Sequence, residues 1–355
     1  MVKSMVFAVP GDLATPTGGY TYDRRIIAEL PALGWQPRVI DLGEGFPNPA
    51  VATRAAACAQ LAALPQNCPI VIDGLAFGVL PDISATLRSS HNLVALVQHP
   101  LALETGLSAA ECACLRASER TALTGARRVI ASSAAMGRLL AADYGVARER
   151  ITVVIPGIER PDPRSTSCGG QHRADEGTIA LLAVGTVVPR KGYDVLIAAL
   201  ARLKDLAWRL TIAGDCERSP ETARRLRADV AELALSDRIT FCGAVASHKL
   251  DQLYASADLF VLASRFEGYG MAYTEAMAHG LPVIGTNAGA IPETIPAAAG
   301  LLVPADDTEA LAGALRRLIE HPQQRARLAA GARAAQFPSW REQAALFAHA
   351  LEMLA

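Results

Sequence analysis

The sequence lacks the short motifs that identify many cofactor- and metal-dependent proteins. Its seven cysteines form no Cys-x-x-Cys pair, and an odd, scattered set of cysteines fits free thiols in a reducing cytoplasm. Neither a Walker A loop nor a Gly-x-Gly-x-x-Gly dinucleotide sequence is present, which disfavours a P-loop enzyme and a nicotinamide cofactor. No Asp-x-Asp pair stands at an expected strand end. We therefore expect a site without a metal ion and without a bound cofactor.

Net charge and long apolar runs are also missing. The formal net charge is −1, so nothing in the composition suggests a nucleic acid or a strongly anionic partner. No run of 18 apolar residues occurs, which predicts no transmembrane segment. The apolar run within residues 1–10 is too short for a signal peptide and is expected to be a strand. These features predict a cytoplasmic protein.

Both halves of the chain repeat the same pattern, in which apolar strands alternate with alanine-rich helices. Repeats of this length predict parallel strands with right-handed crossovers, the doubly wound α/β class. A chain of 355 residues exceeds the usual size of one core, so two domains are expected. We predict an N-terminal Rossmann-like domain over 1–160, a linker or exposed excursion over 161–177, a C-terminal Rossmann-like domain over 178–337, and a terminal helix within 338–355.

The most informative stretch is Ser264–Gly280, S-R-F-E-G-Y-G-M-A-Y-T-E-A-M-A-H-G. It predicts a glycine-rich loop followed by a short helix, placed between two buried strands. Glu267 opens the loop and Glu275 lies on the helix, eight positions later. In parallel sheets, ligands bind beyond the carboxyl ends of strands, close to helix N-termini that attract phosphate. The spacing alone leaves two alternatives open: a glycoside hydrolase pair of carboxylates, or one solvated glutamate on a loop and another on a helix.

A basic pair marks a second strand end. Gly185 ends a predicted strand, and Arg190 and Lys191 follow just before a helix. Two adjacent cations at this position can neutralise a diphosphate leaving group, although a basic pair on the surface is a common alternative. Val245 follows a later strand of the same half.

Three residues of the first half also follow predicted strands. Gly18 and Gly19 come after the first strand, in an expected loop whose backbone N–H groups could approach a phosphate or an acceptor. His99 comes after the fourth strand. An ordinary turn and a structural histidine are the alternatives. Asp12 and Ser133 are weaker candidates.

The Ser264–Gly280 stretch with its continuation L-P-V-I, together with Arg190-Lys191-Gly192, resembles the retaining glycosyltransferases of family 4, the glycosyl transferases group 1. The resemblance implies a GT-B fold, in which two doubly wound Rossmann-like domains face each other across a cleft. It implies that Glu267 contacts the donor sugar, that Glu275 holds the ribose, and that the basic pair binds the diphosphate. It also implies that the terminal helix crosses back to the N-terminal domain.

The expected activity is therefore metal-independent transfer of a hexose, with retention, from a nucleoside diphosphate sugar to an acceptor. A UDP-sugar is the first expectation for the donor and a GDP-sugar the second. A glycan, a lipid or a small molecule could be the acceptor, and peripheral membrane contact is not indicated. A GT-B phosphorylase and a catalytically silent nucleotide-sugar-binding protein are the alternatives. The expected catalytic residues are Glu267, His99, Arg190 and Lys191, and the expected donor-binding residues are Glu275, Gly268, Tyr269, Gly270, Gly185, Gly18, Gly19 and Val245.

Overall fold

The computed structural model describes residues 3–66, 68–159 and 177–354. The chain divides into two compact units, one of residues 1–157 with 338–355 and the other of residues 158–337. The predicted linker, 161–177, lies outside the described residues except for Gly177. Within the described ranges, no helix is long and apolar enough to cross a membrane.

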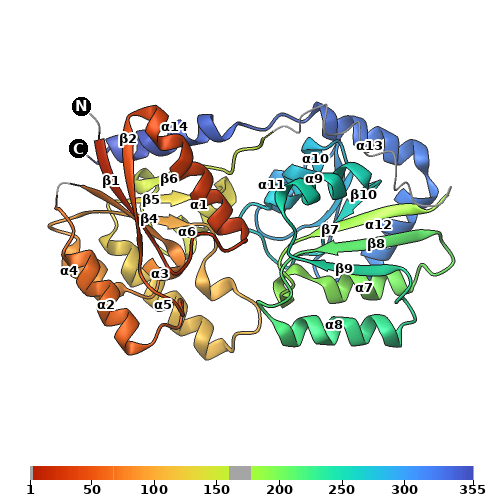
Figure 1. Cartoon of the computed structure of the whole chain (residues 1–355), viewed down its shortest axis with the longest axis horizontal. Helices are drawn as coiled ribbons and strands as arrows, with labels where there is room; N and C mark the ends of the chain where they lie inside the picture. Colours follow the sequence, from red (N-terminus) through yellow and green to blue (C-terminus); the bar gives the residue numbers. More distant parts are fainter. Residues whose placement is uncertain (1–2, 67, 160–176, 355) are drawn as a thin grey trace. The chain divides into compact units, whose positions relative to one another are not determined.

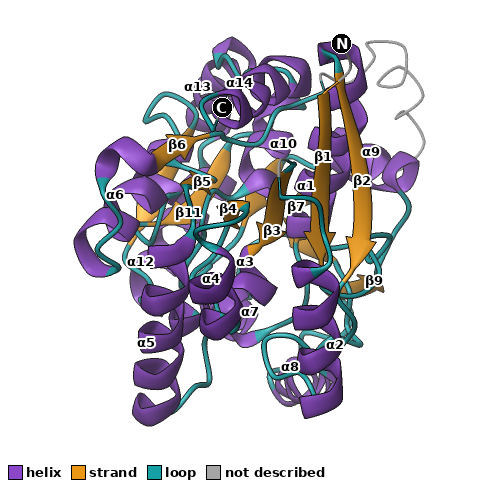
Figure 2. Ribbon diagram, turned by 90° about the vertical axis from the view of Figure 1, so that its left-hand side faces the viewer, coloured by secondary structure: helices purple, strands orange, loops and turns teal. Residues whose placement is uncertain are grey.

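The first unit is built on a six-stranded parallel sheet with the strand order β2-β1-β3-β4-β5-β6 (Figures 1 and 2). The central strand β3 is buried along its whole length, as expected for a parallel strand with helices on both faces. The order reverses between β1 and β3, so the switch point of this sheet lies there. The strands are β1 (Lys3–Val9), β2 (Trp35–Asp41), β3 (Pro69–Asp73), β4 (Asn92–Val97), β5 (Arg128–Ala131) and β6 (Ile151–Val153). The helices are α1 (Gly18–Glu29), α2 (Val51–Ala62), α3 (Gly74–Phe77), α4 (Pro81–Leu87), α5 (Ala109–Gly125), α6 (Ala134–Asp143) and α14 (Trp340–Glu352), with short 3₁₀ turns η1 (Leu30–Leu33), η2 (Leu101–Leu103) and η3 (Arg148–Arg150).

The last helix, α14, packs on the first unit although it lies at the end of the chain. Trp340 meets Tyr22 of α1 edge to face at 5.8 Å between ring centroids, and Phe347 stacks on Phe7 of β1 at 6.2 Å. The start of α14 also passes very close to Gly157, where a Cβ atom would lie 2.3 Å from the backbone nitrogen of Trp340. Only glycine therefore fits at position 157 without a shift of the backbone.

The second unit repeats the architecture with the strand order β12-β11-β10-β7-β8-β9. All its neighbouring strands are parallel, and the order reverses between β10 and β7. The strands are β7 (Ile179–Val184), β8 (Trp208–Ala213), β9 (Ile239–Gly243), β10 (Leu259–Val261), β11 (Val283–Thr286) and β12 (Gly300–Val303). The helices are α7 (Tyr193–Ala201), α8 (Pro220–Glu232), α9 (Ser247–Ser256), α10 (Met271–Ala278), α11 (Ile291–Thr294), α12 (Thr308–Glu320) and α13 (Pro322–Ala334), with a 3₁₀ turn η5 (Pro189–Lys191).

One sequence prediction about the local fold is wrong. The sequence predicts a loop at Gly18 and Gly19 and a helix that starts near Tyr22, but the two glycines form the first turn of α1. The side chain of Thr17 accepts a hydrogen bond from the Tyr20 N–H and caps the helix, so the helix begins four residues earlier than predicted.

Candidate functional site

The candidate site of the second unit forms where β7 and β10 end. These strands are neighbours and run in the same direction, so the segments that follow them emerge at the same edge of the sheet. The segment after β7 contains Arg190 and Lys191, and the segment after β10 contains Glu267. The reversal of strand order between β7 and β10 is the place where open α/β sheets bind ligands.

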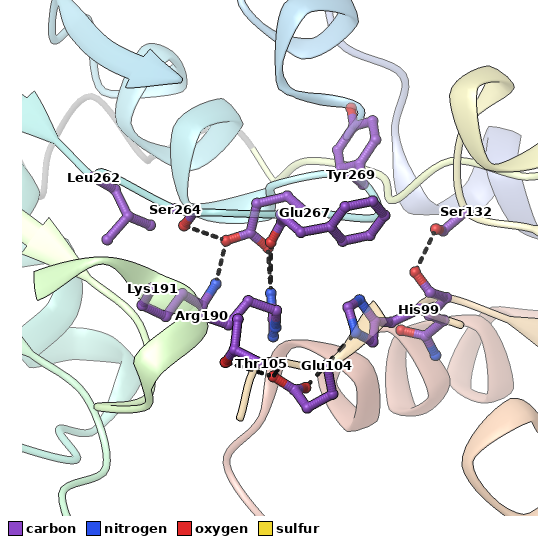
Figure 3. Close-up of polar contacts among 12 residues, drawn as sticks. His99, Glu104, Thr105, Ser132, Arg190, Lys191, Leu262, Ser264, Glu267 and Tyr269 are labelled. Atoms are coloured by element: carbon purple, nitrogen blue, oxygen red, sulfur yellow. Dashed lines mark hydrogen bonds and ion pairs between the residues drawn. The ribbon is translucent and has the colours of Figure 1, made fainter. Parts of the chain in front are cut away.

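Glu267 lies at the centre of a charged cluster (Figure 3). It is 7% exposed. Lys191 Nζ donates to its Oε1 at 2.6 Å, and Arg190 Nη1 lies 3.3 Å from its Oε2. The Ser264 hydroxyl donates to Oε1 at 2.6 Å. The two cations predicted to bind a diphosphate and the carboxylate predicted to contact the sugar are thus one connected group.

The pKa of Glu267 follows from this arrangement. Burial alone would raise it, but the charges of Lys191 and Arg190 and the hydrogen bonds from Lys191 and Ser264 outweigh burial and lower the pKa to about 2. Glu267 is therefore ionised at neutral pH. With one anion and two cations, the cluster has a net charge of +1, which favours an anionic ligand.

Two glycines allow the backbone to bring the cluster together. Gly192 follows Lys191 with φ of +65°, and a Cβ atom there would lie 1.9 Å from the carbonyl oxygen of Ala263. Gly289 has φ of +57°, and a Cβ atom there would lie 2.3 Å from the carbonyl oxygen of Glu267. Side chains at either position would push the two segments apart.

Glu275 lies on α10, the helix that follows the glycine-rich loop. It is half-buried, and the fully buried Tyr254 donates its hydroxyl to Oε2 at 2.9 Å. Burial raises the pKa of Tyr254 well above its usual value, and the charge of Glu275 adds to this effect, so Tyr254 stays protonated and remains a donor. This bond orients the Glu275 carboxylate.

The other predicted residues of this unit lie on the segments at the strand ends. Gly268 and Gly270 are buried, and Gly270 precedes α10 with φ of +97°. Tyr269 is half-buried, and burial raises its pKa to about 12. Gly185 accepts a hydrogen bond from the Tyr193 hydroxyl at 2.7 Å, and Val245 lies half-buried between β9 and α9.

In the first unit, His99 follows β4, with its Nε2 3.7 Å from Glu104 Oε2. Its neighbour Gln98 donates Nε2 to the Gly19 carbonyl at 3.3 Å and to buried Asp23 at 2.9 Å. The end of β4 is therefore linked to the first turns of α1, where Gly18 also lies.

The two weaker candidates of the first unit differ in their surroundings. Ser133 is buried and caps α6 by accepting from the Met136 N–H at 3.0 Å, which is a structural role. Asp12 is exposed and accepts from the Ala14 N–H at 2.8 Å.

Sequence reasoning does not single out three residues that bond to Glu267 or Glu275 or lie beside them. Ser264 and Arg265 stand in the same S-R-F-E stretch as Glu267, three and two positions before it. Their position in the sequence, close to Glu267, is the signal that could have identified them. Tyr254 is a single aromatic residue on α9, and no sequence pattern connects it with Glu275.

Comparison with known proteins shows which family this chain resembles. Residues 170–335 match the model of the glycosyl transferases group 1. Mannosylfructose-phosphate synthase of Agrobacterium fabrum is 35% identical over 174 residues, which cover 46% of this chain and 38% of that protein. A D-inositol 3-phosphate glycosyltransferase of Pseudarthrobacter chlorophenolicus is 32% identical over 238 residues, which cover 64% of this chain and 56% of that protein. The chain thus spans about half the length of the curated relatives it matches.

Solved structures match along nearly the whole chain. Sucrose-phosphate synthase from Thermosynechococcus elongatus has a TM-score of 0.83 at 21% identity and covers 99% of both chains. Anabaena Alr3699/HepE, in complex with UDP-glucose, has a TM-score of 0.79 at 21% identity, again covering 99% of both chains. These similarities show that the two Rossmann-like units have the GT-B fold. The sequence similarity to the glycosyl transferases group 1 extends over residues 170–335, just under half of the chain.

Proposed function

We propose that this protein is a retaining glycosyltransferase that moves a sugar from a nucleoside diphosphate donor to an acceptor without a metal ion. The observation that carries the proposal is the cluster of Lys191, Arg190 and ionised Glu267 at the switch point of the second sheet. The names of the relatives, a glycosyltransferase and a synthase, support transfer of a sugar. A UDP-sugar is the first choice of donor, since a structural neighbour was solved with UDP-glucose.

The cations have the central chemical task in this proposal. Cleavage of the bond between the sugar and the diphosphate leaves additional negative charge on the leaving phosphate. Preorganised positive charge near that phosphate lowers the barrier, because the charge interacts more strongly with the transition state than with the ground state. Lys191 supplies a point charge and Arg190 a planar fork, and both are held in place by Glu267.

The carboxylates would bind the rest of the donor. Glu267 faces the sugar while holding the cations, and Glu275, oriented by Tyr254, accepts from the ribose hydroxyls. In the first unit, His99 would contact the sugar. We assign no general base to the protein, since a phosphate oxygen of the donor can take the proton of the acceptor when the reaction proceeds on one face with retention.

The location that we propose is the cytoplasm. Every cysteine among the described residues is a free thiol, as is usual in a reducing compartment.

The first experiment is to find the donor. A panel of nucleotide sugars, tested for hydrolysis without an acceptor, should give one donor with clear turnover, and a chain that turns over none of them would instead be a binding protein. Proton NMR of the product should show that an α-linked donor gives an α-linked product. A β-linked product would contradict the retaining mechanism.

The decisive variant is Lys191→Ala. We expect turnover to fall by roughly 10²–10³, the range for removing one preorganised donor to developing charge. Lys204→Ala, at an exposed position in the same unit, is the control and should keep full turnover. A Lys191→Ala enzyme as fast as the control would remove the cation from the mechanism.

A further inference from the structure

Arg265 lies two positions before Glu267 in the sequence. Arg190 and Lys191 form ion pairs with Glu267, whereas Arg265 pairs with two other carboxylates. Its side chain is 23% exposed and is held by two carboxylates. Nη1 and Nη2 donate to Asp194 Oδ1 and Oδ2 at 3.0 and 2.7 Å, and Nε donates to Asp306 Oδ1 at 2.7 Å. This bidentate pair with Asp194 has the fixed geometry that arginine forms with a carboxylate.

The same arginine is bonded to the backbone of the turn that presents the two cations. Its N–H donates to the carbonyl of Arg190 at 2.8 Å, and its Nη1 donates to the carbonyl of Pro189. In return, Arg190 Nη1 donates to the carbonyl of Phe266 at 2.8 Å. The turn η5 (Pro189–Lys191) is therefore attached to the segment 264–267 by backbone and side-chain bonds, with Arg265 in the middle.

The position of Asp194 completes this arrangement. Asp194 lies in the first turn of α7, directly after the turn η5. Burial raises its pKa, but the hydrogen bonds and the charge of Arg265 outweigh burial, so the pKa is lowered and Asp194 is ionised. Arg265 thus holds η5 from both ends, at Pro189 before the two cations and at Asp194 after them.

We propose that Arg265 is a positioning residue that fixes the turn η5, and with it Lys191 and Arg190, before the donor binds. The proposal rests on the proposed function, in which these two cations stabilise the leaving diphosphate. Lysine and arginine side chains are long and have many rotamers, so their charge is effective only when the backbone beneath them is fixed. Arg265 touches no reacting atom in this proposal and acts only through the turn.

The second unit contains a matched control. Arg316 on α12 also pairs with two carboxylates, Asp205 through two bonds of 2.8 and 2.9 Å and Glu320 at 3.1 Å. Within the part of the chain that the structure describes, Arg316 makes no hydrogen bond to the segments of the candidate site. Arg265→Ala and Arg316→Ala therefore remove the same chemical group with the same number of carboxylate partners, but only the first also loosens η5.

The test uses the full chain and four variants, Arg265→Ala, Arg265→Lys, Arg316→Ala and Lys191→Ala. Binding of UDP and of GDP is measured by calorimetry, and kcat and KM are measured with the best donor of the panel. All measurements are made at a temperature at which circular dichroism shows each variant folded. We expect Arg265→Ala to lose roughly 10-fold in kcat, less than the 10²-fold that a ~1 Å misplacement can cost, with a smaller rise in KM. Arg265→Lys should recover part of the loss, and Arg316→Ala should match the wild type.

Two results would overturn the inference, and they differ from each other. If Lys191→Ala is impaired while Arg265→Ala matches Arg316→Ala in kcat, KM and nucleotide affinity, the positioning role fails and the proposed function stands. If Lys191→Ala itself matches the wild type, the proposed function fails at its cations, and the role of Arg265 fails with it.

Discussion

Glu119 gives a prediction about pH that follows from the first unit alone. This glutamate lies on α5 and is 4% exposed. Its carboxylate accepts from the N–H groups of Leu101 and Ala102, at 2.8 and 3.4 Å, just after His99. Burial raises the pKa of Glu119 from 4.5 to about 7, although these bonds act in the opposite direction.

The sign of the effect on stability follows from the direction of this shift. Because the pKa is higher in the folded chain, the unfolded chain releases the proton first as pH rises. Between pH 4.5 and 7 the folded state binds more protons, so the stability contributed by Glu119 falls with rising pH and is constant above pH 7. A shift of this size at about 1.4 kcal/mol per pH unit corresponds to about 3 kcal/mol in total, most of which falls between pH 5 and pH 8.

The perturbation that tests this is Glu119→Gln, which stays neutral at every pH. The difference in free energy of unfolding between variant and wild type should shift in favour of the variant by roughly 2–3 kcal/mol from pH 5 to pH 8. At about 2–4 °C per kcal/mol for a domain of this size, the difference in Tm should shift by roughly 5–10 °C. Thermal scans by circular dichroism at several pH values measure it, and the comparison cancels the titration of other groups.

Glu111→Gln is the control on the same helix. Glu111 is exposed, and hydrogen bonds from Ser108 lower its pKa, so it stays ionised from pH 5 to pH 8. Its replacement should change stability by the same amount at both pH values. If Glu119→Gln also shows a difference independent of pH, Glu119 is ionised in the folded chain and the reasoning from burial is wrong.

Four further predictions address the site and the fold. Glu275→Gln should weaken binding of nucleoside diphosphate by roughly 1.5–3 kcal/mol through loss of a charge-assisted bond; calorimetry measures it, and equal affinity would exclude Glu275 from the site. His99→Ala should lower turnover and leave nucleoside diphosphate affinity nearly unchanged, whereas wild-type turnover would indicate a structural histidine. Gly157→Ala should lower the free energy of unfolding in urea by roughly 1–3 kcal/mol or more, because the new Cβ atom would lie 2.3 Å from the backbone nitrogen of Trp340. The control is Gly313→Ala on α12, where the new Cβ atom would meet no other atom within 4 Å; it should be neutral or stabilise by up to about 1 kcal/mol. Turnover should persist in EDTA, and loss of turnover that magnesium or manganese restores would contradict a site without metal.

The buried strands were the part of the fold that sequence reasoning predicted best. The sequence predicts strands over 179–184 and 208–213, and β7 (Ile179–Val184) and β8 (Trp208–Ala213) have these bounds. β7 is a continuous apolar run, and β8 is mostly apolar although its Arg209 is exposed. Each of the two strands is followed by a glycine, so both ends are visible in the sequence. Elements with weaker signals were missed, such as β12 (Gly300–Val303) and the polar helix α13 (Pro322–Ala334).

Within the candidate site, local motifs pointed to the residues but not to their pairing. The S-R-F-E-G-Y-G stretch and the Arg190-Lys191 pair were each recognisable. Lys191 and Glu267 are 76 positions apart, and their contact depends on β7 and β10 being neighbours in the sheet. Strand order is a property of the tertiary fold, and no periodicity within either segment encodes it.

This pairing changes the expected role of Glu267. Two cations that are each less than a fifth exposed would be costly to bury next to one another without an anion. The ionised Glu267 removes most of that cost and fixes both cations, since each is bonded to one of its oxygens. One negative charge against two positive charges still leaves the cluster attractive to a diphosphate. A carboxylate that only bound the sugar would not need to contact both cations, so in our proposal Glu267 organises the charge at the leaving group as well as the position of the sugar.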